Sequence, residues 1–192
     1  KVKLLPFDNK SELAVVVDLP EGATLEATER VLGQAAAAIG PVPEILSIQM
    51  HAGTAAPFNF NGLVRHYFYR NTPELGDLQV NLTPKGERRR SSHQIALDLR
   101  ERLRRVALPP GSAIKVVEVP PGPPVLATLL AEVYGPDAAT RRAVTRELEK
   151  LFRQVPYIVD VDSTASAPAA RLRLTIDQDA LEYEGGQQGD VF

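Results

Sequence analysis

The fold is decided by residues 13–48, which read LAVVVDLPEGATLEATERVLGQAAAAIGPVPEILSI. The stretch begins with a run of apolar, largely β-branched residues at 13–17, which is typical of a buried strand. Gly22 interrupts this run, and Thr24 can cap a helix that follows. The apolar residues of that helix recur at helical spacing: Val31, Leu32, Ala35 and Ile39. A second strand over residues 45–48 completes a predicted β-α-β unit.

The same pattern returns at residues 126–161, where Gly135 corresponds to Gly22 at an offset of 113 positions (135 − 22) without a gap. The identical pairs at this offset are Leu13 and Leu126, Ala14 and Ala127, Val31 and Val144, Val42-Pro43 and Val155-Pro156, and Ile45 and Ile158. Buried strands and capped helices share residue types, so the likeness could be general. The constant offset favours a duplicated subdomain.

The composition is that of an ordinary globular protein. The chain has 192 residues, of which 44% are hydrophobic and 24% charged, which suits one domain or two small ones. The net charge of −2 gives no general attraction to nucleic acid, and the absence of Cys excludes disulfides. No apolar run approaches the roughly 20 residues needed to cross a bilayer. The chain begins at Lys1 rather than Met, which is compatible with a piece of a longer protein.

The first half of the chain predicts the element order β-α-β-β-α-β. Residues 63–70 are rich in aromatic residues and look like a strand, and residues 78–82 alternate with period 2. These two stretches would form one long bulged strand or a hairpin. Ser91 and Gln94 form a capping box before the second helix, and residues 113–119 form the last strand. This is the split βαβ, or ferredoxin-like, order of an α+β fold, with two helices on one face of a four-stranded antiparallel sheet.

The clearest domain boundary is the proline-rich linker at residues 120–124, because proline cannot join the interior of a sheet. It separates a first subdomain at residues 1–119 from a second at residues 125–192.

The second subdomain begins like the first. Asp137 can cap its helix, and strands are predicted over residues 158–161 and 171–176. Residues 190–192 look like the start of a further helix. We therefore expect a complete first ferredoxin-like subdomain and a partial second one, with the order β-α-β-β.

Several stretches, taken in order over essentially the whole chain, carry a resemblance to a known family. They are residues 5–12, 19–28, 43–45, 61–68, 120–124, 176–177, 185–186 and 190–191. Together they resemble the second large periplasmic loop of a resistance-nodulation-division (RND) efflux pump of the acriflavine-resistance type. The resemblance implies two ferredoxin-like porter subdomains, a transmembrane helix before Lys1, and docking hairpins and further membrane helices after Phe192. The family's proton-relay residues would lie in those helices, outside this chain.

The resemblance also implies a function. The chain would be the periplasmic substrate-binding and conduit portion of a proton-driven antiporter in the bacterial inner (plasma) membrane, exporting drugs or other small molecules, and not an enzyme. The implied partners are small-molecule efflux substrates, two further copies in a homotrimer, a periplasmic adaptor and an outer-membrane channel. Neither nucleic acid nor a cofactor is expected. The alternative is a stand-alone regulatory small-ligand-binding module with tandem ferredoxin-like domains.

Residues 53–62 lack periodicity and form a predicted loop, at the place where these pumps have a switch loop between two substrate pockets. Phe58 and Phe60 alternate with amide side chains, which offers apolar contact to ligands of many shapes together with hydrogen bonds for orientation. The two rings could instead fold back onto the protein's own core. The candidate substrate-binding residues are Phe58, Asn59, Phe60, His66 and Tyr67, and the candidate hinges of the loop are Gly53 and Gly62.

If residues 64–70 form a strand, His66 lies on one face and Tyr67 on the other. One face would meet the helices, and the other would be free to stack on a planar ligand. A solvated outer face with cross-strand packing is the alternative.

No metal site is predicted. His51, His66 and His93 are the only histidines, Met50 is the only methionine, and a metal site needs three or four ligands. The scarcity of soft ligands also disfavours a pump for copper or silver.

The other polar clusters point to no chemistry. A basic cluster interrupted by acids suits a solvated face or a subunit contact; its members are Arg88, Arg89, Arg90, Arg100, Arg102, Arg104 and Arg105. No nucleophile elbow or phosphate-binding loop is present, and nothing marks the acid pair Asp160 and Asp162 as a catalytic dyad.

Overall fold

The computed structural model describes residues 8–57, 62, 66–119, 127, 129–165, 173 and 175–191. The elements in chain order are β1 (Glu12–Asp18), α1 (Leu25–Ile39), β2 (Ile45–Ala52), the 3₁₀ turn η1 (Tyr67–Tyr69), β3 (Leu75–Leu82), α3 (Ser92–Leu103), β4 (Ala113–Val117), α4 (Ala138–Arg153), α5 (Gln178–Tyr183) and α6 (Gln188–Val191). The predicted order β-α-β-β-α-β of the first half is confirmed.

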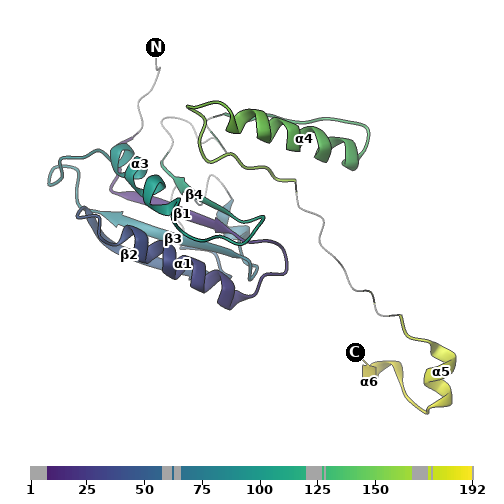
Figure 1. Ribbon diagram of the computed structural model, residues 1–192. Coiled ribbons are helices and arrows are strands. Elements are labelled where there is room, and N and C mark those ends of the chain that lie inside the picture. Colours follow the sequence, from purple (N-terminus) through teal and green to yellow (C-terminus); the bar gives the residue numbers. More distant parts are fainter. Residues whose placement is uncertain are drawn as a thin grey trace.

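The four strands form one antiparallel sheet in the order β2-β3-β1-β4. β1 lies in the middle, where Val15 is opposite Leu78 of β3 on one side and Val116 of β4 on the other. Helices α1 and α3 lie side by side and pack against the strands from one face (Figure 1). The chain therefore has an α+β fold with one sheet face covered by helices.

The core lies between this sheet and the two helices. Successive residues of β1 point to opposite faces, so Leu13, Val15 and Val17 join the helices in the main core, each at most 2% exposed. The helical stripe predicted for α1 is confirmed, since its members are all buried: Val31, Leu32, Ala35 and Ile39. Burying one large aliphatic side chain contributes about 1.5–3 kcal/mol, so this layer is the main source of stability.

The helices begin where their capping residues predict. The Thr24 hydroxyl accepts a hydrogen bond from Ala27 N at 3.3 Å, before α1. Ser91 and Gln94 form both bonds of the predicted capping box, before α3. Asp137 accepts a bond from Thr140 N at 2.8 Å, before α4. Each cap satisfies a backbone N–H that has no partner inside the helix.

The strand predicted over residues 63–70 is wrong within the described residues 66–70. His66 has a left-handed backbone with φ 55°, and Tyr67–Tyr69 form a single 3₁₀ turn. A hairpin partner would have to lie beside β3, but β1 and β2 already occupy both sides of that strand. Aromatic residues favour strands only where a neighbouring strand can pair with them.

The elements predicted for residues 125–192 are found only in part. α4 forms as expected, and α6 overlaps residues 190–192 but begins at Gln188, two residues before the predicted start. The strand predicted over residues 158–161 is wrong, because this segment is irregular and Asp160 has a φ of 55°. The described residues of the stretch 171–176 are not in a strand either. Among the described residues after β4 no strand is present to pair with them, so their backbone has no sheet to join.

None of the described helices is both long enough and apolar enough to span a bilayer.

Candidate functional site

The predicted loop at residues 53–62 starts at a fixed point of the fold. Gly53 has a φ of +62°, and a Cβ at this position would lie 2.7 Å from Leu25 Cδ1 of α1. The Gly53 N–H donates to the Leu75 carbonyl at 2.8 Å. The positive φ favours glycine here, and a larger residue would also have to displace the end of the Leu25 side chain. Of the candidate residues on this loop, Phe58, Asn59 and Phe60 lie outside the described residues, and Gly62 is half-buried.

Beyond the loop, Tyr67 packs on the face of the sheet that α1 and α3 leave uncovered, which we call the helix-free face. Its side chain contacts a small second core of Ala14, Val16 and Val117. Arg70 lies next to it, with the guanidinium carbon 5.4 Å from the centre of the Tyr67 ring, a cation–π distance.

His66 and Tyr67 are adjacent in one turn rather than on opposite faces of a strand. The His66 ring lies 6.4 Å from the ring of Tyr69, at an interplanar angle of 36°. The turn therefore gathers aromatic rings beside the helix-free face, although the predicted strand geometry is wrong.

Arg70 is the centre of a buried ionic network that the sequence analysis missed. It lies 2.6 Å from Asp18 of β1 and 3.1 Å from Asp77 of β3, and it also donates to the carbonyls of Val17 and Gly76 at 3.0 and 3.3 Å. These contacts fix η1 to the middle of the sheet. The available signal was the presence of Asp18 and Asp77 in largely apolar strands, because charged side chains there point away from the main core.

The pKa values of the two carboxylates in this network are shifted in opposite directions. Burial raises the pKa of Asp18, but attraction to Lys115 and Arg70 outweighs burial, so its pKa is lowered. Burial raises the pKa of Asp77 and here dominates over attraction to Arg70, so its pKa is raised. Among the described residues, Asp18 is ion-paired with two cations, Arg70 and Lys115, whereas Asp77 is paired with Arg70 alone. This explains why the pKa is lowered for Asp18 and raised for Asp77.

The rest of the helix-free face is polar. Gln79 and Asn81 of β3 lie opposite Gln49 and Ser47 of β2, and the Asn81 amide donates to the Ser47 hydroxyl at 3.0 Å. Beside the ring of Tyr67, this surface offers amides and a hydroxyl, whereas the ionic network of Arg70 is largely buried and already paired. Such a mixture can bind a ligand with both apolar and hydrogen-bonding groups.

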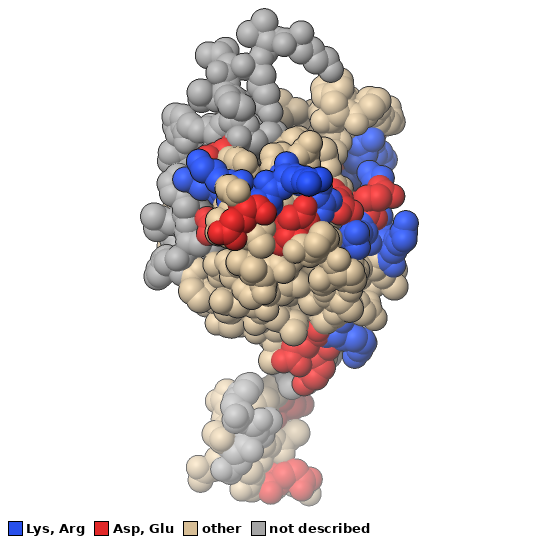
Figure 2. Space-filling view, turned by 90° about the vertical axis from the view of Figure 1, so that its left-hand side faces the viewer, with Lys and Arg blue, Asp and Glu red and all other residues tan. Residues whose placement is uncertain are grey.

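Four arginines of the predicted basic cluster are paired with acids: Arg90, Arg100, Arg102 and Arg104. Arg90 donates to Glu44 at 2.5 and 2.7 Å and to Asp98 at 2.8 Å, and Arg102 also donates to Asp98 at 2.8 Å. The hydrogen bonds to Glu44 and Asp98 raise the pKa of Arg90. Figure 2 shows basic and acidic side chains intermixed in a band across one face. Mutual neutralisation of this kind does not create the basic surface that nucleic acid requires.

The described residues contain no group of three or more His, Cys, Asp or Glu side chains that could hold a metal ion.

Comparison with known proteins shows which protein family this chain matches. The model of the AcrB/AcrD/AcrF family matches residues 2–192. Two crystal structures of a heavy metal efflux pump, crystal forms II and I, superpose with TM-scores of 0.68 and 0.69. Both are 22% identical in sequence, and the matches cover 97% and 98% of this chain but 19% of the pump chain. At this identity the likeness shows a shared fold. No curated protein sequence matches the chain at a significant level.

Proposed function

Because the chain belongs to the AcrB/AcrD/AcrF family of RND transporters, we propose that it is the periplasmic substrate-binding and conduit portion of a proton-driven efflux pump. The observation that carries the proposal is the family match over residues 2–192. Members of this family are transporters and not enzymes.

The architecture supports a finer assignment of the first half. The sheet order β2-β3-β1-β4, with α1 and α3 on one face, is the order of a ferredoxin-like unit. We assign residues 1–119 to a first porter subdomain, residues 120–124 to a linker, and residues 125–192 to the first part of a second. The family match runs across all three segments.

The helix-free face is the part of this chain that would meet substrate. A polar and aromatic surface on a rigid sheet can bind varied small molecules without disturbing the core behind it. Tyr67 packs on this face, His66 precedes it at the start of η1, and Gly53 anchors the start of the loop that carries Phe58 and Phe60. In this proposal the two Phe rings contact apolar substrates, and the loop between Gly53 and Gly62 gates their passage.

The whole pump would act as a homotrimer in the inner membrane, with a periplasmic adaptor and an outer-membrane channel as partners. Its substrates would be drugs or other small molecules. The chain spans 19% of the pump chains with which it shares its fold, so the membrane helices and proton-relay groups would be supplied by other parts of the pump.

The test is export by the full-length pump in cells. Replacing Phe58 and Phe60 by Ala should reduce export of bulky apolar compounds several-fold, because the rings are proposed to supply the apolar contact. Small polar substrates should be affected less. Accumulation of fluorescent dyes of different size, at equal amounts of pump in the membrane, measures the effect.

The matched control is Tyr183→Ala, which removes a ring that is 89% exposed and lies far from the loop in sequence. Unchanged export of every compound by the double variant would remove the loop from the mechanism. A parent reading frame without apolar segments of roughly 20 residues would contradict the transporter assignment as a whole.

A further inference from the structure

The acid pair Asp160 and Asp162, to which the sequence assigned no chemistry, binds back to the first half of the chain. Asp160 Oδ2 accepts a hydrogen bond from Arg100 Nε of α3 at 2.8 Å. Asp162 forms an ion pair with Lys115 of β4. The segment that follows α4 is therefore attached at two points to elements of the β-α-β-β-α-β unit.

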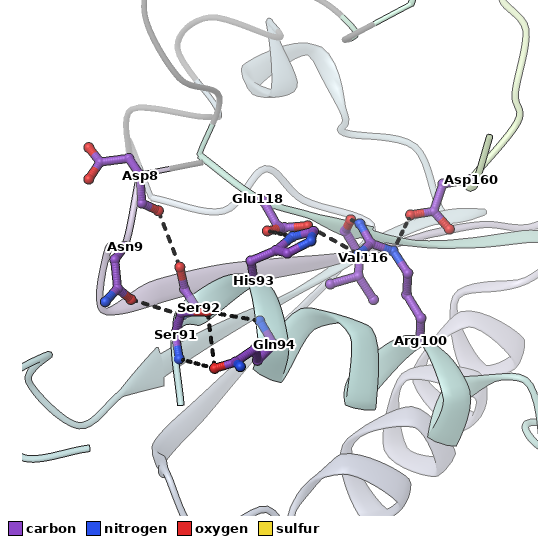
Figure 3. A network of polar contacts seen from close by, with 10 residues as sticks. All are labelled: Asp8, Asn9, Ser91, Ser92, His93, Gln94, Arg100, Val116, Glu118 and Asp160. Atoms are coloured by element: carbon purple, nitrogen blue, oxygen red, sulfur yellow. Dashed lines mark hydrogen bonds and ion pairs between the residues drawn. The ribbon is translucent and has the colours of Figure 1, made fainter. Parts of the chain in front are cut away.

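Arg100 is oriented by its own half of the chain. Its Nη1 lies 3.1 Å from Glu118 Oε1, and its Nη2 donates to the Val116 carbonyl at 2.8 Å. Glu118 is 8% exposed and also contacts His93 Nδ1 at 2.9 Å. Figure 3 shows Arg100 reaching from α3 toward Val116, with Asp160 on its other side. The guanidinium is held in place by the first half, and its Nε is the group that meets Asp160.

Lys115 is held in the same way. Its Nζ lies 2.6 Å from Asp18 Oδ2, and Asp18 is in turn held by Arg70. Burial lowers the pKa of Lys115, but attraction to Asp18 and Asp162 is stronger, and the pKa is raised. The ammonium group is thus charged and already paired before Asp162 is counted.

Both cations are shared between a permanent and a removable partner. If the segment after α4 moves away, Arg100 keeps Glu118 and Lys115 keeps Asp18. The large cost of breaking a buried ion pair comes from leaving one charge unpaired, and here neither cation is left unpaired. The attached state also holds Asp160 in a left-handed backbone, which non-glycine residues adopt at a cost.

Little apolar packing opposes the release. No residue of α4 is buried, Tyr157 and Val159 are 80% and 50% exposed, and Ile158 and Val161 are half-buried. Within the described part of the chain, the two ion pairs are the polar contacts that hold residues 158–162 against the first half.

We propose that residues 158–162 form a releasable ionic clasp, in which Asp160 binds Arg100 and Asp162 binds Lys115. When the clasp is closed, α4 keeps one position relative to the sheet. When it is open, α4 moves without disturbing the core. The role of the clasp in a pump rests on the proposed function. There, opening and closing of the clasp would set the separation of the two halves of this chain.

The chain lacks Cys, so two introduced cysteines can be spin-labelled without removing native ones. We choose Leu97 on α3, which is 49% exposed, and Ala143 on α4, which is exposed. Pulsed electron paramagnetic resonance then measures the distribution of distances between the labels in the full 192-residue chain. The test variant is Asp160→Asn with Asp162→Asn. Asn removes the charge but tolerates a left-handed backbone, so the change isolates the ion pairs.

The control variant is Glu182→Gln with Glu184→Gln. It removes two acids at the same spacing from the exposed end of α5. The ionic strength is varied from 0.01 M to 1 M, which shortens the screening length from about 30 Å to about 3 Å. Circular dichroism on each variant checks that the fold is retained.

The native chain and the control should give one narrow distance population at low salt, and this population should fall by at least half at high salt. The Asn variant should give a broad distribution at both salt concentrations. A narrow population that survives in the Asn variant, or a broad one in the native chain at low salt, would overturn the clasp. Equal broadening in the control would also overturn it. None of these outcomes involves transport, so failure of the clasp and failure of the proposed function are distinguishable.

Discussion

Asp18 shows how one side chain connects several parts of the molecule. It follows five apolar residues of β1, yet its carboxylate lies 2.6 Å from both Arg70 of the aromatic turn and Lys115 of β4. The alternation along β1 predicts that Asp18 points away from the main core. It does not predict the partners, because Arg70 comes from a segment whose aromatic residues suggested a strand. Cross-strand pairing depends on tertiary structure that local patterns do not contain.

We expect Asp18→Asn to lower the free energy of unfolding by about 1–3 kcal/mol at neutral pH, because two buried cations lose a shared carboxylate. The pKa of Asp18 is lowered from 3.8 on folding, so its contribution is full above the unfolded value and is lost as the pH falls through the folded value. Urea unfolding of both proteins should therefore show a difference in the free energy of unfolding at neutral pH, and this difference should shrink as the pH falls below 3.8 and through the lowered pKa of the folded state.

Asp179→Asn is the control for this experiment, because Asp179 is an exposed acid in the first turn of α5. It should change the free energy of unfolding by less than about 0.5 kcal/mol. If the difference in the free energy of unfolding between the native protein and Asp18→Asn stays constant from neutral to acid pH, the carboxylate contributes by its shape and not by its charge.

At the scale of elements, the sequence predicts those whose signals are local. Thr24, Ser91 and Asp137 cap the expected helices, and the stripe from Val31 to Ile39 is buried as predicted. The failures are strands whose partner is missing. Residues 66–70 have no free neighbour beside β3, and residues 158–161 have no described strand to pair with. At the candidate site, the roles of His66 and Tyr67 stay predictions, and no local pattern indicated the ionic network around Arg70.

The capping residues of α3 and α4 should contribute differently to the free energy of unfolding. Ser91→Ala should lower the free energy of unfolding by about 1 kcal/mol, because α3 is packed on the sheet and fraying its first turn weakens the core. Asp137→Ala removes an equivalent cap from α4, which has no buried residue. It should reduce α4 helicity, seen in NMR chemical shifts, and leave the main unfolding transition unchanged. A shift of that transition by Asp137→Ala as large as that by Ser91→Ala would show that α4 shares the main core.

At the scale of the whole molecule, burial is distributed unevenly along the chain. β1, α1, β3 and α3 contain most of the fully buried side chains, whereas α4 and α5 have none. The ionic clasp at residues 158–162 attaches the second half without extending the hydrophobic core into it. The two halves should therefore differ in local stability.

Hydrogen–deuterium exchange measures this difference directly. We expect amides of β1 and β3 to exchange only through global unfolding, because both strands are paired and their core residues are buried. Amides of α4 should exchange at least 100-fold faster, through local opening. Equal protection of α4 and β1 would show that the second half is stabilised by contacts beyond those described. The peptides of α3 provide the internal control, since this helix is packed on the same sheet.

Of the described α-helices, α1 and α3 cover one face of the sheet, and this separates two kinds of mutation. Along β3, Leu78 and Val80 are buried under the helices, while Gln79 and Asn81 between them belong to the other side. A codon change at Gln79 or Asn81 alters the outer surface without repacking the interior. Homologous chains can therefore diverge in what they recognise while they retain the same interior, one strand position at a time.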